Sequence, residues 1–349
     1  MHSHKAFATL SEFLLQAGTE YFILDVSRTR HLLDNQRFFD YENNERPYDC
    51  PRQGYAWFCL VFWNKSMNQE HYIWFLKLPV DEQGLIQQAA RDQFLQIVIE
   101  ALGNELQKVD TTSAELPENP FVFVPSQQLL ADCNAFIRHH LDLPNRPGLA
   151  KAFTYIKAPN VQPWAELSVQ DISDFASKIH HKPHEQAVIA NLSQLPDAVC
   201  LCLFSSFEGI KLPSELNHAL LNYQQSADDK LSAMALRALA SSHNSAVKDY
   251  VHSLISSDNP LDIETLVVIA GRFWQCLIPQ EHTEQDYLSL YLAKVAKADA
   301  HFDLFKGIYA DLVHLPSLRV FLLATIRQKA QCEVLNQAIA TLFAKRARN

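Results

Sequence analysis

The spacing of hydrophobic and polar positions changes near residue 125 of this 349-residue chain. Before that point, helical spacing alternates with runs rich in aromatic and β-branched residues, which favour strands. Beyond it, nearly every segment repeats its apolar residues at intervals of three and four, as amphipathic helices do. The pattern therefore predicts an α+β domain over residues 1–125, with a mainly antiparallel sheet, and an all-α domain over residues 126–349.

The first region yields a short series of expected elements. An apolar stripe predicts a helix over 5–17, with Gly18 as its C-terminal cap. Two aromatic runs, 55–63 and 71–78, are separated by a polar loop and predict an antiparallel hairpin. The remaining predictions are strands over 21–26, 36–41 and 121–124, and a helix over 85–102 that ends at Gly103.

Three of the five tryptophans, Trp57, Trp63 and Trp74, belong to the hairpin. Trp57 and Trp63 are six residues apart, so a regular strand places both side chains on one face of the sheet. The aromatic residues have two interpretations. They form a core beneath the helix over 85–102, or they offer an exposed surface that binds a partner.

In the second region, helix starts carry capping chemistry as well as apolar spacing. Ser126 is positioned to cap the first helix, and three capping boxes pair Ser168 with Asp171, Ser226 with Asp229, and Thr283 with Asp286. Breaks recur at about 13 to 20 residues, so two helices fill roughly 35 to 40 residues, the period of HEAT-like or TPR-like solenoids. No residue signature repeats with that period, and an irregular helical bundle is the alternative.

One apolar stripe in this region runs from Ile263 to Ile278, with Val268 and Ile269 on the opposite side. Hydrophobic residues on both sides predict a long helix buried between neighbours.

Composition excludes several function classes. The eight glycines are scattered, so no glycine-rich nucleotide loop is present, and no cofactor is expected. The net charge is −9, with 10 basic and 17 acidic residues in 1–125. That balance disfavours nucleic acid, which needs a basic face. Nucleic-acid binding would require one set of residues to gather on a single face: Lys294, Lys297, Arg319, Arg327, Lys329, Lys345 and Arg346.

Cysteine usage and hydropathy bear on the compartment. The seven cysteines are odd in number and most lie within apolar runs, which is typical of reduced thiols in the cytoplasm. No apolar run approaches the ~20 residues that span a bilayer, and the N-terminal stretch lacks the features of a signal peptide. We therefore expect a cytoplasmic protein without a membrane span.

A group of charged residues follows two predicted strands. Asp25, Arg28 and Arg30 come after the first strand, and Asp81 and Glu82 come after the hairpin. If both strand ends meet at one edge of the sheet, these groups form a ligand-binding or acid–base site. In the alternative interpretation, the two acidic residues stabilise the start of the following helix and the arginines pair with them.

Other reactive residues have plain structural interpretations. His180 and His184 are spaced for zinc on a helix, but Pro183 lies between them, which favours a polar turn. Cys200 and Cys202 point to different faces of a helix, so they are expected to be buried thiols. Ser205 and Ser206 lack the glycine turn of a nucleophile and are expected inside a helix. No metal site or catalytic residue is therefore assigned.

Four short stretches resemble a known family. They are Phe13–Gly18 leading into Phe22–Asp25, Trp74–Pro79 with Asp81–Leu85, Ala90–Asp92, and Asn119–Phe121. Together they resemble the bacterial family named domain of unknown function 3549. The resemblance covers the whole chain and implies a full-length cytoplasmic bacterial protein with no assigned activity, cofactor or catalytic residue.

These observations favour a non-catalytic binding or scaffold protein over an enzyme. The expected partner is a protein or peptide held on a helical-repeat surface. The alternative is a small-ligand-binding or enzymatic site at the strand ends of the first domain.

Overall fold

The computed structural model describes residues 8–64, 71–105, 116–161, 163–226, 228–242, 244–280, 285–327 and 332–343. The chain divides into two compact units. Unit 1 comprises residues 1–124 with 314–316, and unit 2 comprises residues 125–313 with 317–349. The α+β class of the first and the all-α class of the second are confirmed.

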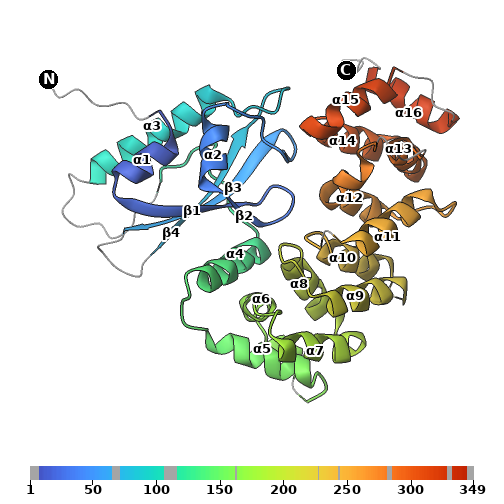
Figure 1. Cartoon of the computed structure of the whole chain (residues 1–349), viewed down its shortest axis with the longest axis horizontal. Coiled ribbons are helices and arrows are strands. Elements are labelled where there is room, and N and C mark those ends of the chain that lie inside the picture. Colours follow the sequence, from blue (N-terminus) through green and yellow to red (C-terminus); the bar gives the residue numbers. More distant parts are fainter. Residues whose placement is uncertain are drawn as a thin grey trace. The chain divides into compact units, whose positions relative to one another are not determined.

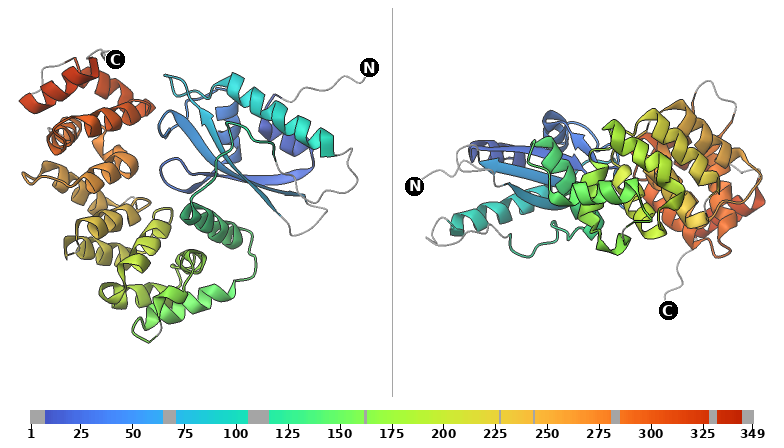
Figure 2. Two further views of the ribbon diagram at one scale, coloured as in Figure 1. Left: turned by 180° about the vertical axis from the view of Figure 1, so that it is seen from behind. Right: turned by 90° about the horizontal axis from the view of Figure 1, so that it is seen from below.

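Unit 1 is a four-stranded antiparallel sheet with three helices on one face (Figures 1 and 2). The strand order is β2-β1-β3-β4. Its elements are α1 (Leu10–Gln16), β1 (Thr19–Asp25), β2 (His31–Leu33), α2 (Asn35–Glu42), β3 (Tyr55–Asn64), β4 (Tyr72–Pro79) and α3 (Gln88–Glu105).

Strand register places the C-terminal ends of two strands at the same end of the sheet. Asp25 pairs with Phe58, and Tyr55 pairs with Pro79, so β1 and β4 run parallel and end on the same side of β3. Strands β3 and β4 pair antiparallel, so the predicted hairpin is confirmed. Beyond β4, the backbone of residues 121–123 adds a short pairing: Lys77 N donates to Phe121 O at 2.8 Å, and Phe123 N donates to Phe75 O at 3.0 Å.

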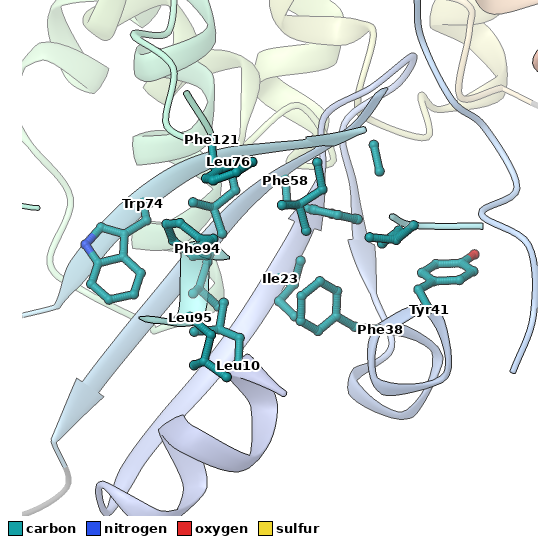
Figure 3. Close-up of a cluster of buried hydrophobic side chains, with 14 of the residues drawn as sticks. Leu10, Ile23, Phe38, Tyr41, Phe58, Trp74, Leu76, Phe94, Leu95 and Phe121 are labelled. Atoms are coloured by element: carbon teal, nitrogen blue, oxygen red, sulfur yellow. The ribbon is translucent and has the colours of Figure 1, made fainter. Parts of the chain in front are cut away.

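The core of unit 1 lies between the sheet and its helices (Figure 3). Alternate strand residues such as Ile23, Phe58 and Leu76 face this core, as a period of two requires. Phe38 from α2 meets Phe58 edge-on with ring centroids 5.1 Å apart. The opposite face carries Phe22, Leu24, Cys59, Val61 and Phe75, which are buried as well.

Two predictions in unit 1 are wrong. Residues 36–41 belong to helix α2, not to a strand, because Asp34 caps it by accepting the N–H of Arg37 at 3.1 Å. Phe38 and Tyr41 are three residues apart and reach the core together. Helix α3 begins later than expected, since Ile86 still pairs with Val80, and it continues through Gly103 to Glu105. Gly18 does follow α1 in the left-handed conformation, with φ of 72°.

All regular secondary structure in the described residues of unit 2 is helical. In Figure 1 its helices from α5 onward follow one another in chain order from green to red. The α-helices are α4 (Gln127–His140), α5 (Pro147–Lys157), α6 (Val169–Ala176), α7 (Lys182–Asn191), α8 (Asp197–Phe207), α9 (Ser214–Ser226), α10 (Asp229–Ala238), α11 (Ser245–Ser256), α12 (Ile263–Arg272), α13 (Tyr287–Ala298), α14 (Asp303–Leu312), α15 (Pro316–Thr325) and α16 (Glu333–Phe343). Short 3-10 turns are η1 (Trp164–Glu166), η2 (Leu192–Gln194) and η3 (Trp274–Leu277).

The helices of unit 2 form two rows of neighbours. Each even-numbered helix from α4 to α14 contacts the next even-numbered one. Helices α5, α7 and α9 contact in turn, and α11 contacts α13. Helix pairs such as α5 with α6, α9 with α10 and α13 with α14 join the rows. Each pair therefore packs against the pair before it.

The capping predictions have three different outcomes. Ser126 caps α4, and Ser168 with Asp171 forms the predicted capping box at α6. Ser226 is instead the last residue of α9, and Asp228 caps α10 because its carboxylate accepts the N–H of Leu231 at 2.9 Å. Thr283 lies outside the described residues, and α13 is capped by Asp286.

The apolar stripe from Ile263 to Ile278 is not one buried helix. Helix α12 ends at Arg272, and a 3-10 turn follows. Ile263 and Val267 are each 48% exposed, so the prediction of a helix covered on all sides is wrong at these positions.

Candidate functional site

Asp25, the first of the predicted site residues, is the centre of a buried polar cluster. It is 1% exposed, and its Oδ1 accepts the N–H of Ser27 at 2.9 Å. The hydroxyl of Tyr48 donates to Oδ2, and the Cys50 thiol lies 3.4 Å from the same oxygen. Ser27 Oγ in turn lies 2.5 Å from the Tyr48 hydroxyl and accepts the N–H of Trp57 at 2.9 Å. The cluster thus ties β1 to β3 and to the segment before β3.

The ionisation of this cluster follows from its burial. Loss of solvent raises the pKa of Asp25, although His31 and the Tyr48 hydroxyl act in the opposite direction. Burial, and then the negative charge of Asp25, raise the pKa of Tyr48 and of Cys50 well above their usual values. Cys50 is therefore a neutral thiol, which is a poor nucleophile. With Asp25, Ser27 and Tyr48 all enclosed, the cluster is built to hold the strand end in place.

The two arginines after β1 are also largely enclosed. Arg28 donates through Nε and a terminal nitrogen to the carbonyl of Pro51, at 2.9 and 2.6 Å, and is 3% exposed. Arg30 is 9% exposed. Arg28 therefore fastens the segment before β3 to the end of β1.

Asp81 and Glu82 lie at the same edge of the sheet but serve a different purpose. Asp81 Oδ1 accepts the N–H groups of Gln83 and Leu85, at 2.8 and 2.9 Å, and closes its own turn. Glu82 is exposed. Strand β3 lies between these residues and Asp25, which separates β1 from β4 by about 10 Å. The two strands thus end at the same end of the sheet, but the side chains that follow them do not form one cluster.

The three candidate tryptophans are divided between the two faces of the sheet. Trp74 is in the core of unit 1, with its ring centroid 4.6 Å from Phe62, and is 8% exposed. Trp57 and Trp63 are half-buried on the opposite face. The Arg52 guanidinium lies 4.3 Å from the Trp57 ring centroid, and Phe123 lies 4.7 Å from it. The structure thus places Trp57 and Trp63 on the face opposite the core of unit 1, whereas Trp74 belongs to that core.

The histidines near the start of α7 pack against neighbouring side chains and, within the described residues, are not arranged as metal ligands. Pro183 is in the first turn of α7, so His180 precedes the helix that carries His184. The His184 ring packs 4.5 Å from Phe153 and 5.0 Å from Phe175, and burial lowers its pKa. Among the residues that the structure describes, no group of three or more His, Cys, Asp or Glu side chains is placed to hold a metal ion.

A polar network joins α4, α6 and α8 inside unit 2. The side-chain amide of Gln128 donates to Ser206 Oγ at 3.0 Å and to Ser173 Oγ at 3.3 Å. Ser206 is inside α8 as predicted. Cys202 donates to Gln128 Oε1 at 3.2 Å, whereas Cys200 is buried next to Leu195 and Tyr223. Burial raises the pKa of both thiols, to about 11 for Cys200.

A second cluster, which sequence analysis missed, joins α8, α10 and α12. Glu208 is 7% exposed, and its two carboxylate oxygens accept hydrogen bonds from Arg237 and Arg272. Two positive charges therefore share one negative charge. The three residues span 64 positions of sequence, and no local pattern links them.

Two cavities lie at opposite ends of α11. The first, of about 300 Å³, is between the turn before α11 and the end of α12 with η3. The second, of about 250 Å³, is between the turn after α11 and α13. In both, polar side chains from turns meet apolar residues from helices, the composition of many ligand-binding sites.

These features define a protein with an antiparallel α+β unit, whose polar centre is closed, followed by an all-α unit that contains open cavities. Residues 5–343 match the family model described as Protein of unknown function (DUF3549), and the chain belongs to that family. No curated protein and no solved structure matches the chain. Among the described helices, none combines the length and the apolar character needed to cross a membrane.

Proposed function

We propose that the protein is a non-catalytic binding or scaffold protein whose helical unit presents a surface to a protein or peptide partner. The observation that carries this proposal is the pair of exposed apolar side chains on α12, Ile263 and Val267. Four residues apart, they share one face of the helix. Leu266 and Ile269 on the other side are fully buried. Exposed apolar side chains that share one face of a helix are typical of an interface.

The arrangement of the helices supports the same proposal. Pairs that pack on the preceding pair, as in HEAT-like and TPR-like solenoids, create extended faces on which a partner chain can lie. Gly271 follows Val267 by one turn on the same face, and a Cβ atom added there would have no heavy atom within 4 Å. The face therefore continues without a side chain, and a partner can approach the backbone.

A ligand-binding or enzymatic site at the strand ends of unit 1 takes second place. Its central carboxyl, Asp25, is 1% exposed and is surrounded by hydrogen-bonding partners from the protein itself. A nucleic-acid surface is also less well supported, since Lys294 donates to the carbonyls of Ser257 and Asn259. The other basic residues of that prediction include Lys329, Lys345 and Arg346, which lie outside the described residues.

We include a cytoplasmic location and a bacterial origin in the proposal. All seven cysteines are free, which supports a reducing compartment. The origin rests on the sequence resemblance alone.

In-cell cross-linking followed by purification of the tagged full-length chain tests the proposal. We expect a protein partner at near-stoichiometric yield, and at least a tenfold lower yield with Val267→Glu, because a carboxylate in an apolar contact must be desolvated. Leu15→Glu is the matched control, since Leu15 of α1 is 64% exposed and lies in unit 1. The absence of a stoichiometric partner, or equal loss with both variants, would refute the proposal.

A further inference from the structure

The second cavity, of about 250 Å³, combines an apolar wall with two lysines, and we call it the α13 cavity. Its apolar lining includes Pro260 and Leu261 from the turn after α11, and Leu290 and Ala293 from α13. Leu290 is 38% exposed, so the apolar wall reaches the surface. A cavity of this size can enclose one apolar side chain of a partner, the kind of contact that anchors many interfaces.

Both lysines lie on the same face of α13 as the apolar residues. Lys294 and Lys297 follow Leu290 by four and seven positions, which is the spacing of one helix face. Lys294 is half-buried, and Lys297 is exposed. An apolar surface and two positive charges therefore meet within one small space.

The ammonium of Lys294 is held by neutral groups from the turn. It donates to the backbone carbonyls of Ser257 and Asn259, each at 2.7 Å. An ammonium has three N–H donors, so an anion in the cavity can accept the third. The two carbonyls also fix the position of this charge at the cavity wall.

The charges around Lys294 favour such an anion. Burial, and then the positive charge of Lys297, lower the pKa of Lys294, while Asp258 acts in the opposite direction. Asp258 is exposed and also lines the cavity. Its carboxylate compensates the burial and the repulsion only in part, so a second carboxylate between the two lysines would stabilise the charged form of Lys294.

We propose that the α13 cavity binds the C-terminal residue of the partner protein or peptide, with an apolar side chain against the apolar wall and the carboxylate between Lys294 and Lys297. This inference rests on the proposed function. A C-terminal residue carries its side chain and its carboxylate on the same carbon atom, so one residue satisfies both parts of the cavity. An internal Asp or Glu would supply the charge without the apolar group. Capture of a C-terminal carboxylate is a recurring mode of peptide recognition.

The cavity is close in sequence to the surface that carries the proposed function. Leu261 lines the cavity, and Ile263 of the exposed α12 face follows it by two residues, at most about 7 Å of chain. Val267 is about one helical turn farther on. A peptide whose last residue occupies the cavity can therefore contact the α12 face with the residues before it.

Fluorescence anisotropy with the full-length chain, at low ionic strength, tests this site with two N-terminally labelled peptides of five alanines and a final leucine. One peptide has a free C-terminal carboxylate, and the other has a C-terminal amide. We expect the amide to bind at least tenfold more weakly. Lys294→Gln should weaken binding of the free acid at least tenfold, because it removes a partly buried charge. Lys297→Gln should weaken it about threefold, since an exposed charge contributes less.

Lys248→Gln is the matched control, because Lys248 lines the other cavity together with Arg272 and its replacement removes the same charge. It should change binding less than twofold. Lys297→Arg keeps the charge and should bind as the unmodified chain does. Circular dichroism verifies that each variant is folded, and Lys297→Gln, at an exposed position, keeps the test decisive if Lys294→Gln does not fold.

Four results would overturn the inference. They are no binding of the free acid, equal binding of the acid and the amide, equal effects of Lys297→Gln and Lys248→Gln, and equally tight binding of an amidated peptide with an internal aspartate. Cross-linking distinguishes this failure from failure of the proposed function. If Lys294→Gln captures the partner as well as the unmodified chain does, while Val267→Glu loses it, the α13 cavity is not the carboxylate site and the α12 surface still binds.

Discussion

Asp25 in unit 1 and Glu208 in unit 2 are both buried carboxylates, but their partners carry different charges. Asp25 is held by a backbone N–H, a tyrosine hydroxyl and a thiol, all of them neutral. Glu208 is held by two guanidinium groups. Burial raises the pKa of Asp25 in the neutral cluster, whereas Glu208 accepts hydrogen bonds from two positively charged side chains. The two carboxylates are thus held by different chemistry, with neutral donors in unit 1 and guanidinium groups in unit 2.

The comparison shows that buried carboxylates can be held by interactions of very different strength. A carboxyl with neutral donors gains only the modest net energy of hydrogen bonds, and nothing outside the cluster is needed to complete it. A carboxylate shared by two arginines is held by charge-assisted hydrogen bonds, which are about twice as strong as neutral ones. Replacing Glu208 and replacing Asp25 should therefore lower the free energy of unfolding by different amounts.

Glu208→Gln should have the largest effect. It removes the negative charge that Arg237 and Arg272 share, so we expect the free energy of unfolding to fall by about 3 kcal/mol. Urea denaturation followed by circular dichroism measures this change. Glu264→Gln, at an exposed position of α12, is the control and should change stability little. If Glu208→Gln costs no more than the control, the charged cluster contributes nothing and the comparison fails.

Asp25→Asn should have a smaller effect, a loss of about 1.5 kcal/mol at pH 7, because neutral hydrogen bonds are lost or weakened. Its dependence on pH is more informative. The raised pKa means that folded Asp25 binds a proton at pH values where the unfolded chain has released it, so the contribution of Asp25 to stability grows as pH falls from 7 toward 3.8. The variant lacks this gain.

The measurement for Asp25 is the unfolding free energy of both proteins across that range. The stability difference between unmodified protein and Asp25→Asn should widen in favour of the unmodified protein at lower pH. A difference that narrows would mean that Asp25 is stabilised as an anion, and the distinction from Glu208 would be lost.

His184→Phe should have the smallest effect, below about 1 kcal/mol at pH 7, since a third aromatic ring beside Phe153 and Phe175 is well tolerated. Burial lowers the pKa of His184, so the folded protein takes up its proton less readily than the unfolded chain, and stability falls as pH drops below 6.5. The variant should lose less stability between pH 7 and 5. His218→Gln, at an exposed histidine, should behave as the unmodified protein does; a similar rescue there would contradict this explanation.

The elements that sequence predicts correctly are those governed by local chemistry. The hairpin from Tyr55 to Pro79, the cap at Ser126 and the capping box at Ser168 each depend on residues close in sequence. The prediction over 36–41 is wrong because Phe38 and Tyr41 suit an amphipathic helix once Asp34 caps it. At α10 two acceptors, Ser226 and Asp228, competed for the same helix start, and spacing alone does not decide between them.

The sites are less predictable because their members are distant in sequence. Asp25 was identified from its place after a strand, but Tyr48 and Cys50 come from an irregular segment more than twenty residues away. One signal was present, since Cys50 is in a polar stretch unlike most of the other cysteines. Lys248 and Arg272 are related only through the packing of α11 near the end of α12.

The pairing of residues 121–123 with β4 has a consequence for assembly. It occupies the backbone of one sheet edge, and the strand at the other edge, β2, is only three residues long. Exposed strand edges recruit other chains into aggregates or strand exchange. The short strand β2 and the pairing of residues 121–123 with β4 thus reduce the length of strand edge to which another chain could add.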